Sequence, residues 1–146
     1  MKIIRLLWVG RTKDRCLAEG IEYYRRLLSG HARVTILELK EERGKEAEAA
    51  RQIEGRRILS ATGSFILCDE RGREFSSPEF AAYLGGFERV DIVIGGAFGV
   101  SDDVRKHARE CIALSRMTFT HEMARMILME QLFRAATILK GKGYHH

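Results

Sequence analysis

Short, almost wholly apolar segments alternate with segments of helical periodicity along this chain, and this alternation limits the possible folds more than any other feature. Strands are expected at 2–9, 34–39, 64–68, 90–94 and 112–115, and helices at 16–28, at 41–60, over a short stretch from 77, from about 101, and at 122–139. Strands that are apolar on both faces lie inside sheets that helices cover on both sides. The expected fold class is therefore α/β, a mainly parallel sheet with helices on both faces, in a single domain spanning residues 1–146.

Two local signals refine the middle of the chain. Asp69-Glu70-Arg71-Gly72 predicts a turn directly after the third strand. Ser77-Pro78-Glu79 offers a cap and a first-turn proline for the short helix that follows. The charge run within 41–60 is expected to form the solvated face of its helix.

The composition limits the partners and the compartment. A net charge of +5 over 146 residues favours polyanionic partners, although many proteins with this balance never bind nucleic acid. The run Lys2–Val9 is too short to span a membrane and no signal-peptide cleavage site follows it, so we expect a cytoplasmic protein without membrane contact. Cys16, Cys68 and Cys111 are widely spaced and lack histidines at metal-ligand spacing, which favours buried thiols and no metal.

A glycine-rich loop, Gly95-Gly96-Ala97-Phe98-Gly99, follows the fourth strand. Parallel sheets bind ligands at the carboxyl ends of their strands, where glycines let a ligand approach bare backbone. A tight strand-to-helix turn explains the same residues equally well. The spacing matches neither the dinucleotide fingerprint nor the phosphate-binding P-loop, which disfavours a nucleotide-dependent oxidoreductase.

The last predicted helix is apolar on nearly every side, so it must be buried on all sides. Packing between the sheet and a second subunit would bury it, which predicts a homodimer. Ordinary core packing of its methionines is an equal alternative.

The C-terminal stretch is basic and ends in aromatic side chains. Its charged and ring-bearing residues are Arg116, Arg125, Arg134, Lys140, Lys142, Tyr144, His145 and His146. Such side chains suit unpaired RNA, whereas pairing along the helix and a frayed tail are the alternatives. His121, just before the helix, either acts on a substrate or bonds a backbone carbonyl. No Ser-His-Asp or Cys-His set can be assembled from this sequence.

Motifs from residue 92 onward resemble the RlmH family. They are Ile94-Gly95-Gly96-x-x-Gly99, Ala113-Leu114-Ser115, Met117-Thr118-Phe119-x-His121-x-x-Ala124-Arg125, Glu130-Gln131-Leu132-x-Arg134-Ala135 and Tyr144-His145. Weaker similarity upstream, at Val9-Gly10, Glu22-Tyr23, Gly55-x-x-Ile58-Leu59 and Asp69-x-x-Gly72, extends the resemblance over essentially the whole chain.

The resemblance implies a SPOUT fold with a C-terminal trefoil knot that holds S-adenosylmethionine. The family methylates N3 of pseudouridine 1915 in 23S rRNA, in the large subunit or the assembled ribosome, as a homodimer whose partner completes the RNA site. The cofactor is expected to contact Cys68, Gly95, Gly96, Gly99, Ser115, Arg116, Met117, Thr118, Phe119 and Thr120. The nucleotide is expected to contact His121, Arg125, Tyr144 and His145, with Arg134 either on phosphate or paired with Glu130. No residue stands out as the base that removes the proton of the imide nitrogen.

Three positions depart from the family pattern, and they leave alternatives open. Cys68 replaces a usual leucine, Thr120 a proline, and Gly143 a proline or alanine. A non-catalytic module of the same fold that binds RNA or the ribosome, and a knotted methyltransferase acting at another RNA position, are the alternative functions.

Overall fold

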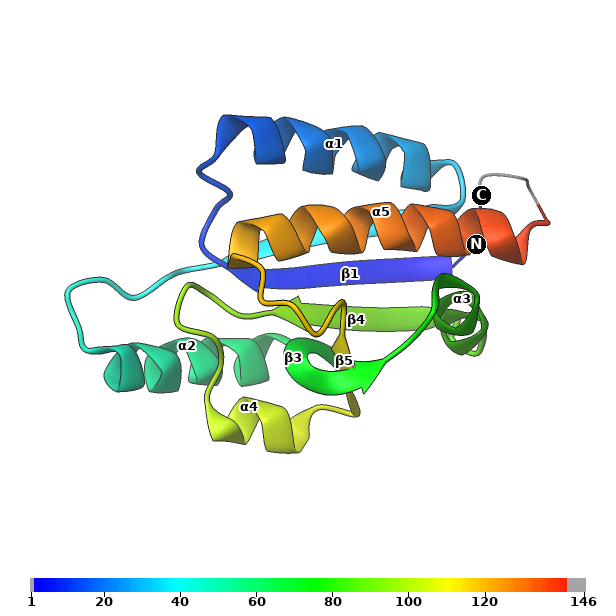
Figure 1. Ribbon diagram of the computed structural model, residues 1–146. Helices are drawn as coiled ribbons and strands as arrows, with labels where there is room; N and C mark the ends of the chain where they lie inside the picture. The colour runs from blue at the N-terminus through cyan, green and yellow to red at the C-terminus, as the bar shows by residue number, and fades with distance from the viewer. Residues whose placement is uncertain (1, 142–146) are drawn as a thin grey trace.

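The computed structural model describes residues 2–141, in which a single sheet has the strand order β2-β1-β4-β3-β5 (Figure 1). All of its neighbouring strands run parallel. The elements in chain order are β1 Lys2–Val9, α1 Arg15–Ser29, β2 Ala32–Leu39, α2 Ala47–Ala61, β3 Ile66–Glu74, α3 Ser77–Gly85, β4 Arg89–Ile94, α4 Asp102–His107, β5 Glu110–Ala113 and α5 His121–Leu139. The predicted α/β class with a mainly parallel sheet is confirmed, whereas the trefoil knot stays a prediction.

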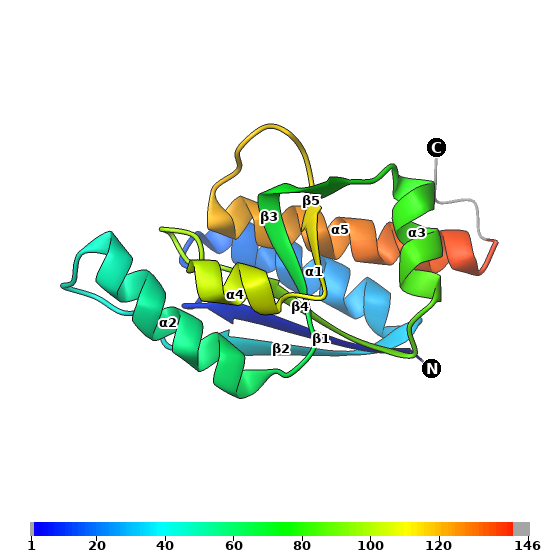
Figure 2. The ribbon, with the colours of Figure 1, turned by 90° about the horizontal axis from the view of Figure 1, so that it is seen from below.

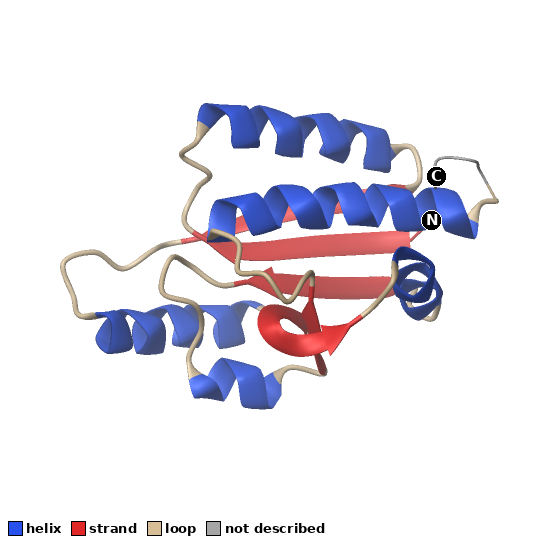
Figure 3. Cartoon of the chain, in the orientation of Figure 1, coloured by secondary structure: helices blue, strands red, loops and turns tan. Residues whose placement is uncertain are grey.

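Helices cover both faces of the sheet (Figures 1 and 3). One core lies under α1, α3 and α5 and includes Leu6, Trp8 and Leu128. The other lies under α2 and α4 and includes Leu7 and Val93. Consecutive strand residues thus enter opposite cores, which explains why β1 and β4 are apolar without interruption.

Helix α5 finds most of its cover within the chain. It packs on α1 and α3, and no residue from Ala124 to Ile138 is exposed. Core packing in one chain therefore accounts for much of its apolar surface, and a second subunit is not needed to bury it. Among residues 2–141, no helix is long and apolar enough to cross a membrane.

Helix α2 starts six residues later than predicted, because 41–46 form a loop. Gly44 in this loop has a φ of +72°, which helices exclude. Glu42 donates its backbone N–H to Glu54 Oε2 at 2.9 Å and accepts from Arg57 at 2.9 Å. The charge run thus holds a loop against α2 instead of forming an exposed helical turn.

The sequence predicted a turn at 69–72 directly after the third strand. That prediction was wrong about the end of the strand, because β3 continues through these residues to Glu74. Cys68 and Arg73 both pair with Ile112 of β5, and the four residues between them bulge out of the ladder. A Cβ on Gly72 would lie 2.6 Å from the carbonyl carbon and oxygen of Cys111. Glycine is required there because backbone presses directly against backbone.

Two smaller expectations also failed. The cap of α3 is Ser76, one residue before the predicted serine, and it forms a capping box with Glu79. Cys16 is exposed in the first turn of α1, outside the apolar stripe of that helix, whereas Cys68 and Cys111 are partly buried. Among the described residues, no group of three His, Cys, Asp or Glu side chains is placed to hold a metal ion.

Candidate functional site

A cleft with a volume of about 980 Å³ opens at the carboxyl ends of β3, β4 and β5. Three segments form its walls, 68–71, 94–100 and 114–120. The first turns of α1 and α5 close one side, through Asp14 and His121 among others. Its position is where parallel α/β sheets place ligands, and its size lies within the roughly 300–1,000 Å³ of small-molecule sites.

The cleft brings together the residues predicted to hold the cofactor, with one exception. Cys68, Gly95, Gly96, Gly99, Ser115, Met117, Thr118, Phe119 and Thr120 all line it. Arg116 does not: its side chain is 87% exposed and its Nε lies 3.7 Å from Glu74 Oε1. Arg116 is therefore placed to contribute its backbone or to meet something outside the cleft.

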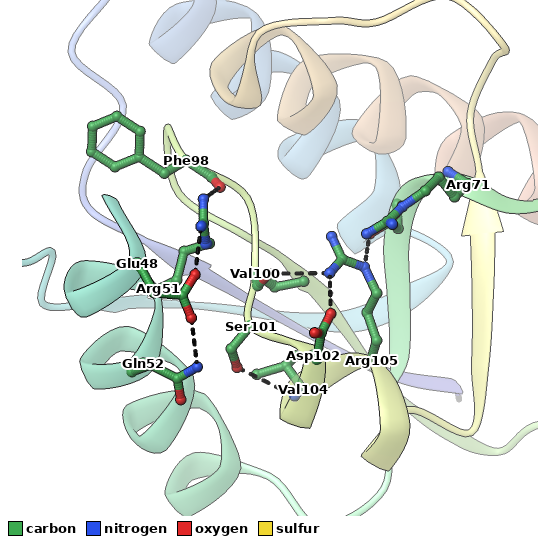
Figure 4. Close-up of polar contacts among 11 residues, drawn as sticks. Glu48, Arg51, Gln52, Arg71, Phe98, Val100, Ser101, Asp102, Val104 and Arg105 are labelled. Carbon is green, nitrogen blue, oxygen red and sulfur yellow. Dashed lines mark hydrogen bonds and ion pairs between the residues drawn. The ribbon is translucent and has the colours of Figure 1, made fainter. Parts of the chain in front are cut away.

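The glycine loop is tightly folded and held from two sides (Figure 4). A Cβ on Gly95 would lie 2.7 Å from Val100 Cγ1, and Gly99 has a φ of +77°. Arg51 of α2 donates to the Phe98 carbonyl at 3.3 Å, and Arg105 of α4 donates to the Val100 carbonyl, also at 3.3 Å. The loop is therefore a tight turn, as one interpretation expected, and it also lines the cleft, so ligand binding by it stays a prediction.

Arg105 also fixes the bulge of β3 at the opposite wall. Its Nε donates to Asp69 Oδ2 at 2.7 Å, while Asp69 Oδ1 accepts the backbone N–H of Arg71 at 2.9 Å. Burial alone would raise the pKa of Asp69, but these hydrogen bonds and the positive charge of Arg105 lower it on balance. Asp69 is thus an anchored carboxylate at the cleft.

Cys68 presents an uncharged thiol to the cleft. Burial, followed by the negative charge of Asp69, raises the pKa of this thiol to about 12. Cys68 therefore serves as a small apolar residue in the wall of the cleft and not as a nucleophile. A leucine, which is usual at this position in the family that the sequence resembles, would offer a similar apolar surface.

The start of α5 joins the cleft to the loop before α1. Thr120 caps the helix by accepting the backbone N–H of Met123 at 3.2 Å. Glu122 Oε1 accepts the backbone N–H groups of Lys13 and Asp14 at 2.8 and 2.9 Å. His121 lines the cleft beside them, with its side chain 27% exposed and Nε2 3.9 Å from Glu122 Oε2. Burial, and then the charge of Arg125, lower the pKa of His121, so its imidazole is neutral near pH 7.

Arg125 lies behind the cleft and does not line it, so its contact with the nucleotide stays a prediction. Its side chain is fully buried. Nη2 donates to the Val9 carbonyl at 2.7 Å, Nη1 donates to Thr12 Oγ1 at 3.1 Å, and the guanidinium carbon is 5.0 Å from the centre of the Trp8 ring. Arg125 thus ties α5 to the end of β1, a supporting role that the sequence motif did not indicate.

Tyr144 and His145 lie outside the described residues, as do Lys142, Gly143 and His146. Arg134 pairs with Glu130, with Nη2 2.7 Å from Oε1, which is the second of the two roles considered for it. Sequence reasoning missed Glu54 of α2, a buried carboxylate whose Oε1 would lie 3.2 Å from a Cβ on Gly96. No local pattern distinguishes it from the exposed Glu48 of the same helix.

Comparison with known proteins agrees with this geometry. A family model described as predicted SPOUT methyltransferase matches residues 1–145. The ribosomal RNA large subunit methyltransferase H of Geotalea uraniireducens is 43% identical, over 98% of this chain and 99% of its own. The proteins of the same name from Geobacter sulfurreducens and Thermodesulfovibrio yellowstonii are 42% and 43% identical, over 98% and 97% of this chain and 99% and 97% of their own. The chain belongs to the SPOUT methyltransferase family.

Proposed function

We propose that this protein transfers a methyl group from S-adenosylmethionine to the RNA of the large ribosomal subunit, at N3 of a pseudouridine in 23S rRNA. The observation that carries the proposal is the cleft itself. Segments far apart in the chain, 68–71, 94–100 and 114–120, meet at the carboxyl edge of the sheet in a protein similar along its whole length to large subunit rRNA methyltransferases.

The cleft fits the cofactor in size and in the chemistry of its walls. Gly96 and Gly99 present backbone, since no side chain stands between them and the cavity. The neutral thiol of Cys68 offers an apolar contact. We assign Cys68, the glycine loop and the backbone of 115–120 to cofactor binding. When bound, S-adenosylmethionine supplies an electrophilic methyl group, so the protein needs to orient the donor and the acceptor nitrogen.

We assign His121 as the acceptor of the imide proton. Its imidazole lines the cleft, it is neutral near pH 7 because burial lowers its pKa, and Glu122 is close enough to stabilise the imidazolium that forms. Glu122 also accepts the backbone N–H groups of Lys13 and Asp14, which ties the first turn of α5, where His121 lies, to the loop before α1.

We further propose that the active form is a homodimer. Phe98 and Met117 line the mouth of the cleft with 54% and 76% of their surface exposed, and Met123 nearby is 39% exposed. Apolar side chains gathered at the mouth of a site suit a partner that completes it. Tyr144 and His145 are the tail residues we assign to the nucleotide in that dimer.

The test is methyl transfer from labelled S-adenosylmethionine to ribosomes purified from a strain that lacks this enzyme. We expect one methyl group per large subunit, located by mass mapping at a pseudouridine of 23S rRNA. Cofactor binding measured by calorimetry without detectable transfer to any ribosomal RNA would contradict the substrate assignment. Absence of cofactor binding would indicate a non-catalytic RNA-binding or ribosome-binding module.

A further inference from the structure

The face of the sheet under α2 and α4 is covered over only part of its length. Helix α2 ends at Ala61, whose carbonyl accepts a hydrogen bond from Arg5 Nη2 at 3.0 Å, in the middle of β1. Figure 2, seen from the side of these two helices, shows the amino-terminal ends of β1, β2 and β4 lying clear of both. A cavity of about 330 Å³ opens there, at the opposite end of the strands from the cleft.

Arginines occupy this uncovered area. Ile3 pairs with both Arg33 of β2 and Arg89 of β4, so these two side chains share the face of Ile3 and Arg5. Arg33 and Arg89 are exposed, and Arg5 and Arg89 line the cavity. Arg109, at its rim, places its guanidinium 4.9 Å from the centre of the Phe87 ring.

Little negative charge offsets these arginines. Asp91 is buried and is bonded to Arg5 and to Thr62 Oγ1, the latter at 2.7 Å, and it acts on Arg89 only through its charge, without an ion pair. Glu88 lies near Lys2 on the other side of the sheet. Glu110 pairs with Ile66, a residue of the core under α5; its charge and that of Arg109 both act on Tyr83, but the two side chains form no ion pair.

The charge of Arg5 is therefore balanced, whereas Arg33, Arg89 and Arg109 form no ion pair with any residue of the described part of the chain.

We propose that these residues, Arg5, Arg33, Arg89 and Arg109, form an arginine face that binds phosphates of the ribosomal RNA at a second place, away from the methyl-transfer cleft. The proposal rests on the proposed function. A guanidinium group can bind two phosphate oxygens at once. The contact of Arg109 with the Phe87 ring restricts the position of that guanidinium group. From Ile3, in register with Arg33 and Arg89, to Val9 at the cleft end of the strand, six residues of β1 span about 20 Å at roughly 3.3 Å per residue. Two contacts that far apart orient a small protein on a large RNA.

The test compares two variants with the same loss of charge. One carries Arg33→Gln, Arg89→Gln and Arg109→Gln, and leaves Arg5 in place because it supports Asp91. The control carries Arg26→Gln, Lys45→Gln and Lys106→Gln, at exposed positions on α1, in the loop before α2 and on α4. Binding of each full-length protein to large ribosomal subunits is measured across a series of salt concentrations, together with cofactor binding, oligomeric state and methyl transfer.

We expect the arginine-face variant to bind large subunits about 10- to 100-fold more weakly, with a salt dependence shallower by about one power per lost phosphate contact. Its affinity for S-adenosylmethionine should stay at the wild-type value, and saturating ribosomes should restore its rate. An equal loss in the control variant, or wild-type binding by the arginine-face variant, overturns the proposal. A change of oligomeric state in that variant also overturns it, because the face would then be a subunit contact. Failure of the wild-type protein to methylate ribosomes contradicts the proposed function instead.

Discussion

Replacing Arg125 by methionine tests whether Arg125 positions the site or contacts the substrate. The change keeps the volume and removes the donors to the Val9 carbonyl and Thr12 Oγ1. It also removes a cation 5.0 Å from the Trp8 ring centre. Because all three contacts tie α5 to the end of β1, we expect a loss of stability together with a loss of order in the loop that carries Lys13 and Asp14.

The size of the loss follows from opposing contributions. A hydrogen bond donated by a charged group contributes about 1.5–3 kcal/mol, and a neutral acceptor deprived of its donor costs about 1–3 kcal/mol. Burial of the guanidinium is itself costly, as the lowered pKa of Arg125 shows, and methionine recovers that penalty. We therefore expect a net loss of about 2 kcal/mol, which lowers Tm by about 4–8 °C in a protein of this size.

The assay combines thermal unfolding with calorimetry for S-adenosylmethionine and methyl transfer to ribosomes. Arg125→Met should lower Tm and weaken cofactor binding and methyl transfer together, while Thr12→Val should lose about 1 kcal/mol because it removes one neutral partner. Arg116→Met, at an exposed position in the neighbouring loop, is the control and should change the stability by less than about 0.5 kcal/mol. A stable Arg125→Met protein that binds the cofactor normally and transfers no methyl group would show that Arg125 acts on the RNA.

Three further predictions follow from the site. Gly72→Ala should destabilise the protein by about 1–3 kcal/mol in urea unfolding, because the new Cβ meets the backbone of Cys111. Gly63→Ala is the control, since a Cβ there has no atom within 4 Å, and it should leave the stability unchanged. Equal losses in the two variants would refute the reasoning. Burial raises the pKa of Glu54, so the stability that its protonated form provides is present at low pH and lost as pH rises through that pKa. Glu54→Gln should therefore gain stability over the wild type with rising pH, and a constant difference would contradict this. His121→Asn should lower kcat/KM by about 10²–10⁴-fold and abolish a pH inflection below the usual histidine pKa of about 6.5; an unchanged profile would exclude His121 as the proton acceptor.

The sequence was sufficient for the order and type of the elements, because the strand and helix periods depend on local patterns. Those patterns could not show that 41–46 form a loop, since the hydrogen bond from Glu42 to Glu54 joins residues whose approach depends on the packing of α2. The bulge of β3 was invisible for a similar reason, because its pairing is decided by β5, more than 35 residues later. The sequence correctly predicted that residues 69–72 depart from regular strand pairing, but it did not predict that pairing resumes at Arg73.

Motif residues allowed most of the cleft to be predicted, since glycines and the segment 115–120 are contiguous runs at strand ends. The position of Arg125 could not be predicted in this way. A basic side chain in a motif has two explanations, contact with an anionic substrate or support of the backbone, and only the three-dimensional partners decide between them. Here the partners are a carbonyl, a hydroxyl and an aromatic ring.

Arginines have different surroundings at the two ends of the sheet. At the cleft, Arg51, Arg105 and Arg125 donate to the carbonyls of the loops that form or support it, so these guanidinium groups are engaged with the protein itself. At the other end, Arg33 and Arg89 have no such partners within residues 2–141. A net charge of +5 therefore does not make the cleft an RNA-phosphate site. Arg33 and Arg89 lie where no cofactor is expected, so the part of the RNA affinity that they provide should be separable from cofactor binding by mutation.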